Sequence, residues 1–220
     1  MSNSGQWLLR FALISILCLV LLAEIPEGLD QETDVIEEQE IFWKPGTDEY
    51  YGNGQLRKCK LDEPQKINGL LCQSWIRFYD DGSIKDCELS KAVEIFEGKT
   101  FPEGTRIFYS ESGLLRHAWL GEDVVFDGLH IKGGYKIDTG FHPDGNLRTV
   151  YLDEPAVIDS IPAEPSMFFA VRCHENGRLK SCKLDDKVTH RGPQYKKGLF
   201  IELDNKGDVT SVEKKSIFDL

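Results

Sequence analysis

Three stretches of the chain decide its fold: FYDDGSIKDCELS (Phe78–Ser90), FHPDGNLRTVYLD (Phe141–Asp153) and CHENGRLKSCKLD (Cys173–Asp185). Each has a glycine after a turn-forming residue, with apolar residues at fixed distances on either side. The same spacing surrounds six glycines, which lie 28, 31, 32, 32 and 30 residues apart: Gly54, Gly82, Gly113, Gly145, Gly177 and Gly207. A fixed period of this kind predicts six tandem copies of one structural unit of about 31 residues.

The apolar columns around the glycines predict a β-hairpin in every unit. Four residues before the glycine stand Tyr50, Phe78, Tyr109, Phe141, Cys173 and Leu203. Two residues after it stand Leu56, Ile84, Leu115, Leu147, Leu179 and Val209. These columns face each other across a three-residue loop that ends in glycine, where the backbone needs a positive φ. The apolar pattern resumes five residues after the glycine, and this odd step predicts a bulge.

The second half of each unit has short β-branched or aromatic runs, such as Val93–Phe96, Val124–Phe126 and Val157–Ile158. A second turn follows them, marked by Gly69, Gly98, Gly128 and Gly192, with Ser160 in the fourth unit. No helical periodicity is present. We therefore expect an all-β fold, an antiparallel meander of six tandem hairpin repeats in a solenoid-like open sheet. The main alternative is a six-bladed propeller, whose blades usually need about 40 residues.

The three quoted stretches resemble the MORN-variant repeat, a family of short, glycine-marked β-hairpin units. The resemblance covers the hairpin half of each unit, from about Asp48 to Lys214, although the repeat here is longer than the family's usual unit of just over twenty residues. Proteins of that family are mostly interaction or scaffold modules, and some are implicated in membrane association. The resemblance implies a binding role and no particular chemistry.

The N-terminal residues have the pattern of a targeting segment. Phe11–Ala23 is an uninterrupted apolar or small run after Arg10, the length of a signal-peptide core, so residues 1–23 are predicted to be a signal peptide or an N-terminal membrane-anchor helix. Cleavage after Ala23 and an uncleaved anchor both stay open, and the bulky Leu17 beside Cys18 disfavours lipidation. Residues 24–40 are predicted to be an acidic, disordered linker, and residues 41–220 the repeat domain. The protein is then exported: periplasmic, secreted or anchored, with membrane contact only through an uncleaved N-terminal segment.

The formal charge of −11 disfavours nucleic acid as a partner, because phosphate binding needs clustered Lys and Arg. Most of this charge lies outside the repeat domain. Arg10 gives +1 and the eight acids of residues 24–40 give −8, which leaves −4 for residues 41–220. Charge therefore constrains the partner of the repeat domain only weakly.

Five cysteines follow Cys18: Cys59, Cys72, Cys87, Cys173 and Cys182. Ala118, Val150 and Val212 fill the column shared by three of them, which favours buried core residues. Disulfides among the five remain an alternative, because an exported domain permits oxidation. The spacing of Cys173, His174 and Cys182 matches no metal motif, and we expect neither a metal nor a cofactor. His142 and His174 share a turn position and are expected to be exposed loop residues.

One column stands out as a candidate binding surface. Six residues after the glycine come Lys60, Glu88, Trp119, Tyr151, Lys183 and Glu213, with large aromatic residues in the two central units. This position should face away from the core, and Phe108 and His117 should share its face. Adjacent exposed aromatics predict a binding patch of Trp119, Tyr151, Phe108 and His117. Alternatively, the short strand pairs cover these rings and form a second small core.

No nucleophile elbow, Walker loop or dinucleotide fingerprint occurs, so we expect a protein that is not an enzyme. The leading hypothesis is an exported or envelope-tethered repeat protein that binds a protein or glycan partner through a sheet face. The first alternative is an exported hydrolase that acts on cell-envelope polysaccharide with paired carboxylates. A weaker alternative is an inhibitor or immunity-type protein.

Overall fold

A computed structural model describes residues 40–215, which form an all-β, antiparallel meander with one large open sheet and no helix in that range. The predicted signal or anchor segment, Cys18 and all of the linker except Glu40 lie outside the described residues. Between residues 40 and 215 no helix is long and apolar enough to cross a membrane.

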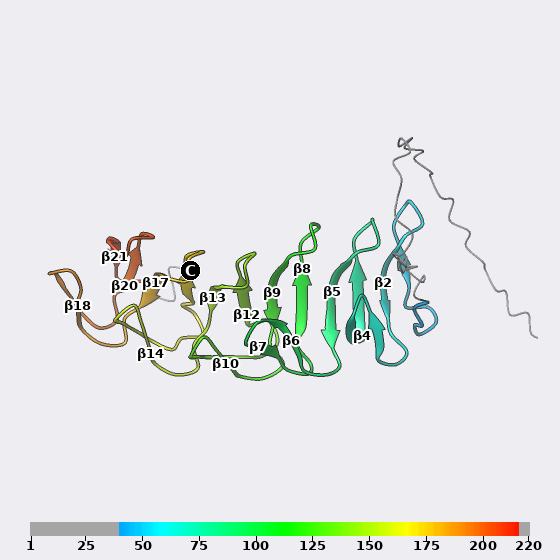
Figure 1. Ribbon diagram of the computed structural model, residues 1–220, viewed down its shortest axis with the longest axis horizontal. Coiled ribbons are helices and arrows are strands. Elements are labelled where there is room, and N and C mark those ends of the chain that lie inside the picture. The colour runs from blue at the N-terminus through cyan, green and yellow to red at the C-terminus, as the bar shows by residue number, and fades with distance from the viewer. Residues whose placement is uncertain (1–39, 216–220) are drawn as a thin grey trace, which may run out of the picture. The chain divides into compact units, whose positions relative to one another are not determined.

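The large sheet follows the order of the chain, as the colours in Figure 1 show. Its strands, in spatial order, are β1 (Glu49–Tyr50), β2 (Leu56–Lys60), β4 (Leu70–Phe78), β5 (Ile84–Leu89), β8 (Arg106–Tyr109), β9 (Leu115–Trp119), β12 (Asp138–Phe141), β13 (Leu147–Val150), β16 (Val171–Cys173), β17 (Leu179–Lys183), β20 (Phe200–Leu203) and β21 (Val209–Glu213). A thirteenth strand, β3 (Gln65–Ile67), pairs with β4. The path ends at β1 and β21, which do not pair with each other, so the sheet is open and the propeller alternative is wrong.

The predicted hairpin register is confirmed at every turn glycine. Phe78 pairs with Ile84 and Phe141 pairs with Leu147, and the four equivalent pairs form likewise. Each hairpin also has a register shift next to this pair, as the odd step in the apolar pattern predicted. The six glycines all have positive φ, between 75° and 87°.

Four short strand pairs connect the long hairpins: β6 (Val93–Phe96) with β7 (Lys99–Phe101), β10 (Val124–Phe126) with β11 (Leu129–Ile131), β14 (Ala156–Ile158) with β15 (Ile161–Ala163), and β18 (Val188–Thr189) with β19 (Gln194–Tyr195). Three of them turn through two consecutive residues of positive φ, for example Asp127 and Gly128, as two-residue hairpins of matching twist require. Their buried residues, such as Phe101 and Phe126, join one core with the sheet residues Ile107 and Ala118. The short pairs therefore cover one face of the sheet and leave the other open.

Side chains at the tight turns connect neighbouring hairpins. The residue three before the turn glycine hydrogen-bonds to a backbone carbonyl of the next hairpin: Tyr51 to Phe78 (2.9 Å), Tyr79 to Tyr109 (2.8 Å), His142 to Cys173 (3.1 Å) and His174 to Leu203 (2.9 Å). We call these four contacts the turn stitches. His142 and His174 are therefore half-buried structural residues, and the expectation that they are exposed was wrong. Ser110 holds the same position, but its hydroxyl bonds within its own turn, to Ser112 and Leu114.

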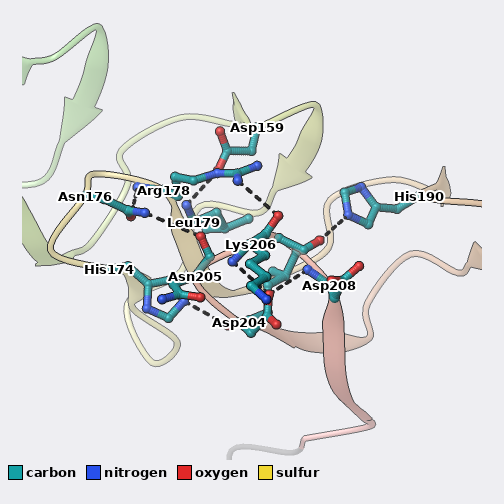
Figure 2. A network of polar contacts seen from close by, with 12 residues as sticks. Asp159, His174, Asn176, Arg178, Leu179, His190, Asp204, Asn205, Lys206 and Asp208 are labelled. Atoms are coloured by element: carbon teal, nitrogen blue, oxygen red, sulfur yellow. Dashed lines mark hydrogen bonds and ion pairs between the residues drawn. The ribbon is translucent and has the colours of Figure 1, made fainter.

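The last turn is held by a wider polar network (Figure 2). Arg178 donates to the carbonyl of Lys206 at 3.0 Å, and His190 bonds to the carbonyl of Gly207 at 2.8 Å. The Asp204 carboxylate accepts the backbone N–H groups of Lys206 and Asp208, and these hydrogen bonds lower the pKa of Asp204. The backbone of the C-terminal hairpin, which has a neighbour on one side only, is thereby fixed by side chains from earlier hairpins.

Candidate functional site

Alternation along β8 and β9 separates the two faces of the sheet. Ile107 and Ala118 point into the core and have no exposed surface, while Phe108, His117 and Trp119 point to the open face. Strand register aligns the open-face residues in rows across the sheet. One row reads Lys58, Arg77, Asp86, Phe108 and His117. The next row contains Glu88, Arg106, Trp119 and Asp138.

Four rings form a continuous aromatic cluster on the open face. The Phe108 and His117 rings stack with centroids 4.4 Å apart, and Trp119 lies 4.7 Å from Phe108. Tyr135, which is 77 % exposed, meets Trp119 edge-on at 5.2 Å. The indole Nε1 of Trp119 donates to Oδ1 of Asp138 at 2.6 Å, which fixes the orientation of the ring. The cluster is therefore an ordered apolar surface with polar side chains beside it.

The pKa of His117 is lowered below its usual value. Burial of the ring is the main cause, and the nearby Arg116 and Arg148 add to it. The Asp138 carboxylate, 3.9 Å from Nε2, acts in the opposite direction. His117 therefore favours its neutral form, which suits a ring stacked on phenylalanine.

Beside the aromatic cluster, two arginines converge on one buried carboxylate. Asp86 on β5 has no exposed surface; Arg77 Nε on β4 donates to its Oδ2 at 2.5 Å, and Arg106 on β8 donates to its Oδ1. The Arg77 side chain is 43 % exposed and the Arg106 side chain 17 % exposed. Because one carboxylate balances only one guanidinium, the trio by itself has a formal charge of +1, and the acids Glu88 and Asp138 lie in the neighbouring row.

A wide cleft of about 720 Å³ is lined by the two arginines of the trio, while Asp86, Phe108 and His117 lie outside its lining. Trp75 lies near one side of it, with the Lys58 ammonium 4.3 Å from the centroid of its ring, and Trp119 and Tyr135 line the other. Its remaining lining is Lys58, Ser74, Arg77, Glu88, Gly104, Arg106, Leu120, Gly121 and Gly134. Indole faces, guanidinium groups and hydrogen-bonding side chains suit a ligand that is itself polar.

The structure brings three of the four predicted patch residues together: Phe108, His117 and Trp119. Tyr151 is half-buried and lines a separate pocket of about 350 Å³ with Ile137 and Met167. None of the four belongs to the core that the short strand pairs form with the sheet.

Five residues of the site were not predicted from the sequence: Trp75, Arg77, Asp86, Arg106 and Tyr135. The column five residues before the turn glycine carried a signal for one of them, because it reads Glu49, Arg77, Phe108, Gly140, Arg172 and Glu202 and shares the open face. Trp75 escaped because β4 is irregular beside it: Ser74 has a φ of 61° and the register shifts between Gln73 and Arg77. Tyr135 lies in a connection outside any repeated column.

All five cysteines of the described residues are buried free thiols, so the disulfide alternative is not formed in this structure. Burial raises the pKa of Cys59 and Cys173 to about 11 and that of Cys182 to about 12. The hydrogen bond with Cys72, together with burial, raises the pKa of Cys87. These groups stay protonated at neutral pH and act as core residues rather than nucleophiles. From residue 40 to residue 215, no group of three or more His, Cys, Asp or Glu side chains is placed to hold a metal ion.

No protein-family model matches the chain, and no curated protein matches its sequence. The resemblance to the MORN-variant repeat therefore stays a prediction from the quoted stretches.

Proposed function

We propose that this protein is an exported or envelope-tethered, non-enzymatic protein of six tandem hairpin repeats that binds a protein or glycan partner through its open sheet face. The observation that carries the proposal is the cleft. It combines the Trp119 platform with the Arg77–Asp86–Arg106 trio on strands that are paired on both sides. Aromatic and arginine side chains on a rigid surface are the usual anchors of a binding site.

The acids around the cleft favour binding over hydrolysis. Both oxygens of Asp86 accept from arginines, Glu88 accepts from Gln73 at 3.0 Å, and Asp138 accepts from Trp119. A glycoside hydrolase needs one carboxyl group free to donate a proton and a second free to act as base or nucleophile. Each of these three acids instead positions another side chain.

The test is cosedimentation of the full-length chain with isolated cell-envelope material. We expect the wild-type chain to bind and Trp119→Ala to lose most of the binding, with little change in the midpoint of thermal unfolding. Tyr151→Ala is the matched control, because it occupies the same repeat position on the same face but lines the other pocket. Equal binding by wild type and Trp119→Ala would contradict the proposal. Release of soluble sugars from the envelope material, abolished by Asp138→Asn, would favour the hydrolase instead.

Intact-mass measurement of the protein from its native host tests the export part of the proposal. A mass that lacks residues 1–23 indicates cleavage, and the full mass indicates an uncleaved anchor. A mass unchanged by reduction is expected from the five free thiols. A gain of two mass units per bridge on reduction would show that disulfides form after export.

A further inference from the structure

Three cations line the cleft, Lys58, Arg77 and Arg106, against one acid, Glu88. Arg77 and Arg106 approach Asp86 from the strands on either side of β5, and both bind the same carboxylate. Arg77 uses its Nε for this contact, so its two terminal amino groups are available toward the cleft. Lys58 is the third cation, at the rim beside Trp75, and its ammonium also pairs with Glu49 at 3.1 Å. This concentration contrasts with the formal charge of −4 on residues 41–220.

The buried Asp86 makes this an ordered site rather than a scatter of surface cations. Its carboxylate has no exposed surface, so a ligand meets the guanidinium groups and not the acid. A guanidinium held in one orientation loses less side-chain entropy when a ligand binds. Asp86 is therefore a positioning residue, and the group it prepares the arginines to bind is a second carboxylate, which fits a guanidinium fork with two parallel hydrogen bonds.

The aromatic rings flank this anion site on both sides. Trp75 is on β4 and Trp119 on β9, which are three strand steps apart in the sheet. At about 4.8 Å per step, the two indoles are roughly 14 Å apart along the sheet. A ligand that spans the cleft thus meets a flat apolar ring, a cationic centre and a second flat apolar ring. Pyranose rings present a flat C–H face to an indole and keep their hydroxyl groups in water.

The sheet offers no backbone edge at this position. Strands β4, β5, β8 and β9 each pair with neighbours on both sides, so an extended peptide cannot add to the ladder here. Recognition cannot use strand addition here, and the large side chains that line the cleft are mostly aromatic rings and cations. This combination favours a glycan over a peptide and an acidic glycan over a neutral one.

We infer that the cleft binds an acidic polysaccharide through uronic-acid carboxylates, with Arg77 and Arg106 on the carboxylate and Trp75 and Trp119 against the flanking sugar rings. This inference rests on the proposed function and names the ligand class for the same site. Arg77 and Trp119 are the residues whose replacement separates charge recognition from ring stacking.

The test is isothermal titration of the full-length chain with oligomers of galacturonate, of mannuronate and guluronate, and of glucuronate-containing hyaluronan. For any oligomer that binds, its methyl ester is the matched neutral probe, because esterification removes the charge and keeps the ring. Dextran sulfate and hexaglutamate test whether any polyanion, or an acidic peptide, is sufficient. We expect at least one uronate oligomer to bind, its ester to bind at least about tenfold more weakly, and affinity to fall as salt rises.

Two variants locate the site. Arg77→Gln should weaken uronate binding by roughly tenfold to a hundredfold, as expected for a charged hydrogen-bond pair. Arg172→Gln is the matched control, because Arg172 is exposed on the same face at the same repeat position but outside the cleft. Arg77→Lys should restore only part of the affinity, since it keeps the charge and loses the fork.

Each contrary result has a separate meaning. Equal affinity for acid and ester, with binding still lost in Trp119→Ala, would overturn the acidic class and leave a glycan-binding cleft intact. Equal affinity for dextran sulfate, or tighter binding of hexaglutamate, would overturn recognition of uronic acids. Absence of binding to every uronate oligomer would overturn the inference, while the envelope-binding experiment decides the proposed function on its own.

Discussion

The two faces of the large sheet differ in how strictly the chain repeats them. On the core face, the column five residues after the first five turn glycines holds Cys59, Cys87, Ala118, Val150 and Cys182, all small, apolar and without exposed surface. The sixth member, Val212 on the terminal strand, is also apolar but is 40 % exposed. On the open face, the next column reads Lys60, Glu88, Trp119, Tyr151, Lys183 and Glu213. The same backbone thus carries a uniform set of residues on one side and a different residue in each hairpin on the other. The uniform face specifies the fold, and the variable face is free to form a cleft at one place.

The largest expected effect comes from comparing one truncation on the core face with one on the open face. Ile107 on β8 is fully buried between Cys87 and Ala118, so Ile107→Ala should lower the free energy of unfolding by about 2–5 kcal/mol. Trp119→Ala removes a larger side chain from the open face and should cost only about 1 kcal/mol. Urea unfolding of both variants measures the difference. Ile107→Val, expected to cost about 0.5–1.5 kcal/mol, is the graded control; a larger loss in Trp119→Ala than in Ile107→Ala would show that the open face is part of the core.

The turn glycines look alike in sequence, but their surroundings differ. A second test therefore separates the cost of backbone strain from the cost of a steric clash with a neighbouring side chain. Gly113 and Gly145 have φ of 75° and 87°, and alanine at either position should cost about 1–2 kcal/mol in backbone strain. At Gly113 an added Cβ meets nothing, whereas at Gly145 it would lie 2.6 Å from Cδ1 of Phe96. Gly145→Ala should therefore cost at least about 1 kcal/mol more than Gly113→Ala in chemical unfolding. Equal costs would mean that Phe96 moves aside freely.

A turn stitch is absent at Ser110, whose hydroxyl bonds within its own turn instead of to the next hairpin. Tyr79→Phe removes one stitch and should lower the free energy of unfolding by about 0.5–1.5 kcal/mol. Ser110→His copies the residue of the fourth and fifth turns and should raise it by up to about 1 kcal/mol, by adding a bond to the carbonyl of Phe141. Thermal unfolding of both variants checks the signs. A stabilised Tyr79→Phe, or a destabilised Ser110→His, would show that the stitches do not hold neighbouring hairpins together.

The contrast between the faces also explains what could be predicted from the sequence. Turn glycines and apolar alternation act within a dozen residues, so the hairpin register and the buried column were readable. The cleft depends on side chains from β4, β5, β8 and β9 and from a connecting loop. Asp86 between Arg77 and Arg106 requires the lateral register of three strands, which one local pattern does not encode. Trp75 was missed because the backbone at Ser74 is irregular. Tyr151 was assigned to the patch because it shares the repeat column of Trp119, but it lines a different pocket.

The smallest expected effect is the pH dependence of stability that His117, on the open face, contributes. Burial lowers its pKa in the folded state, so the unfolded chain, with a histidine pKa of about 6.5, binds the proton more readily. The contribution of His117 to stability is therefore complete above about pH 6.5 and decreases as the pH falls from there to the folded-state pKa. The side chain is still 33 % exposed, so water reduces the effect to a small one. NMR titration should place the His117 pKa below 6.5, and His117→Gln should flatten the loss of stability between pH 6.5 and 5.

An acidic ligand in the neighbouring cleft would favour the protonated ring of His117. The pKa of His117 should therefore rise when a uronate oligomer is added, and it should not rise in Arg77→Gln. This result would connect the titration of His117 to occupancy of the cleft.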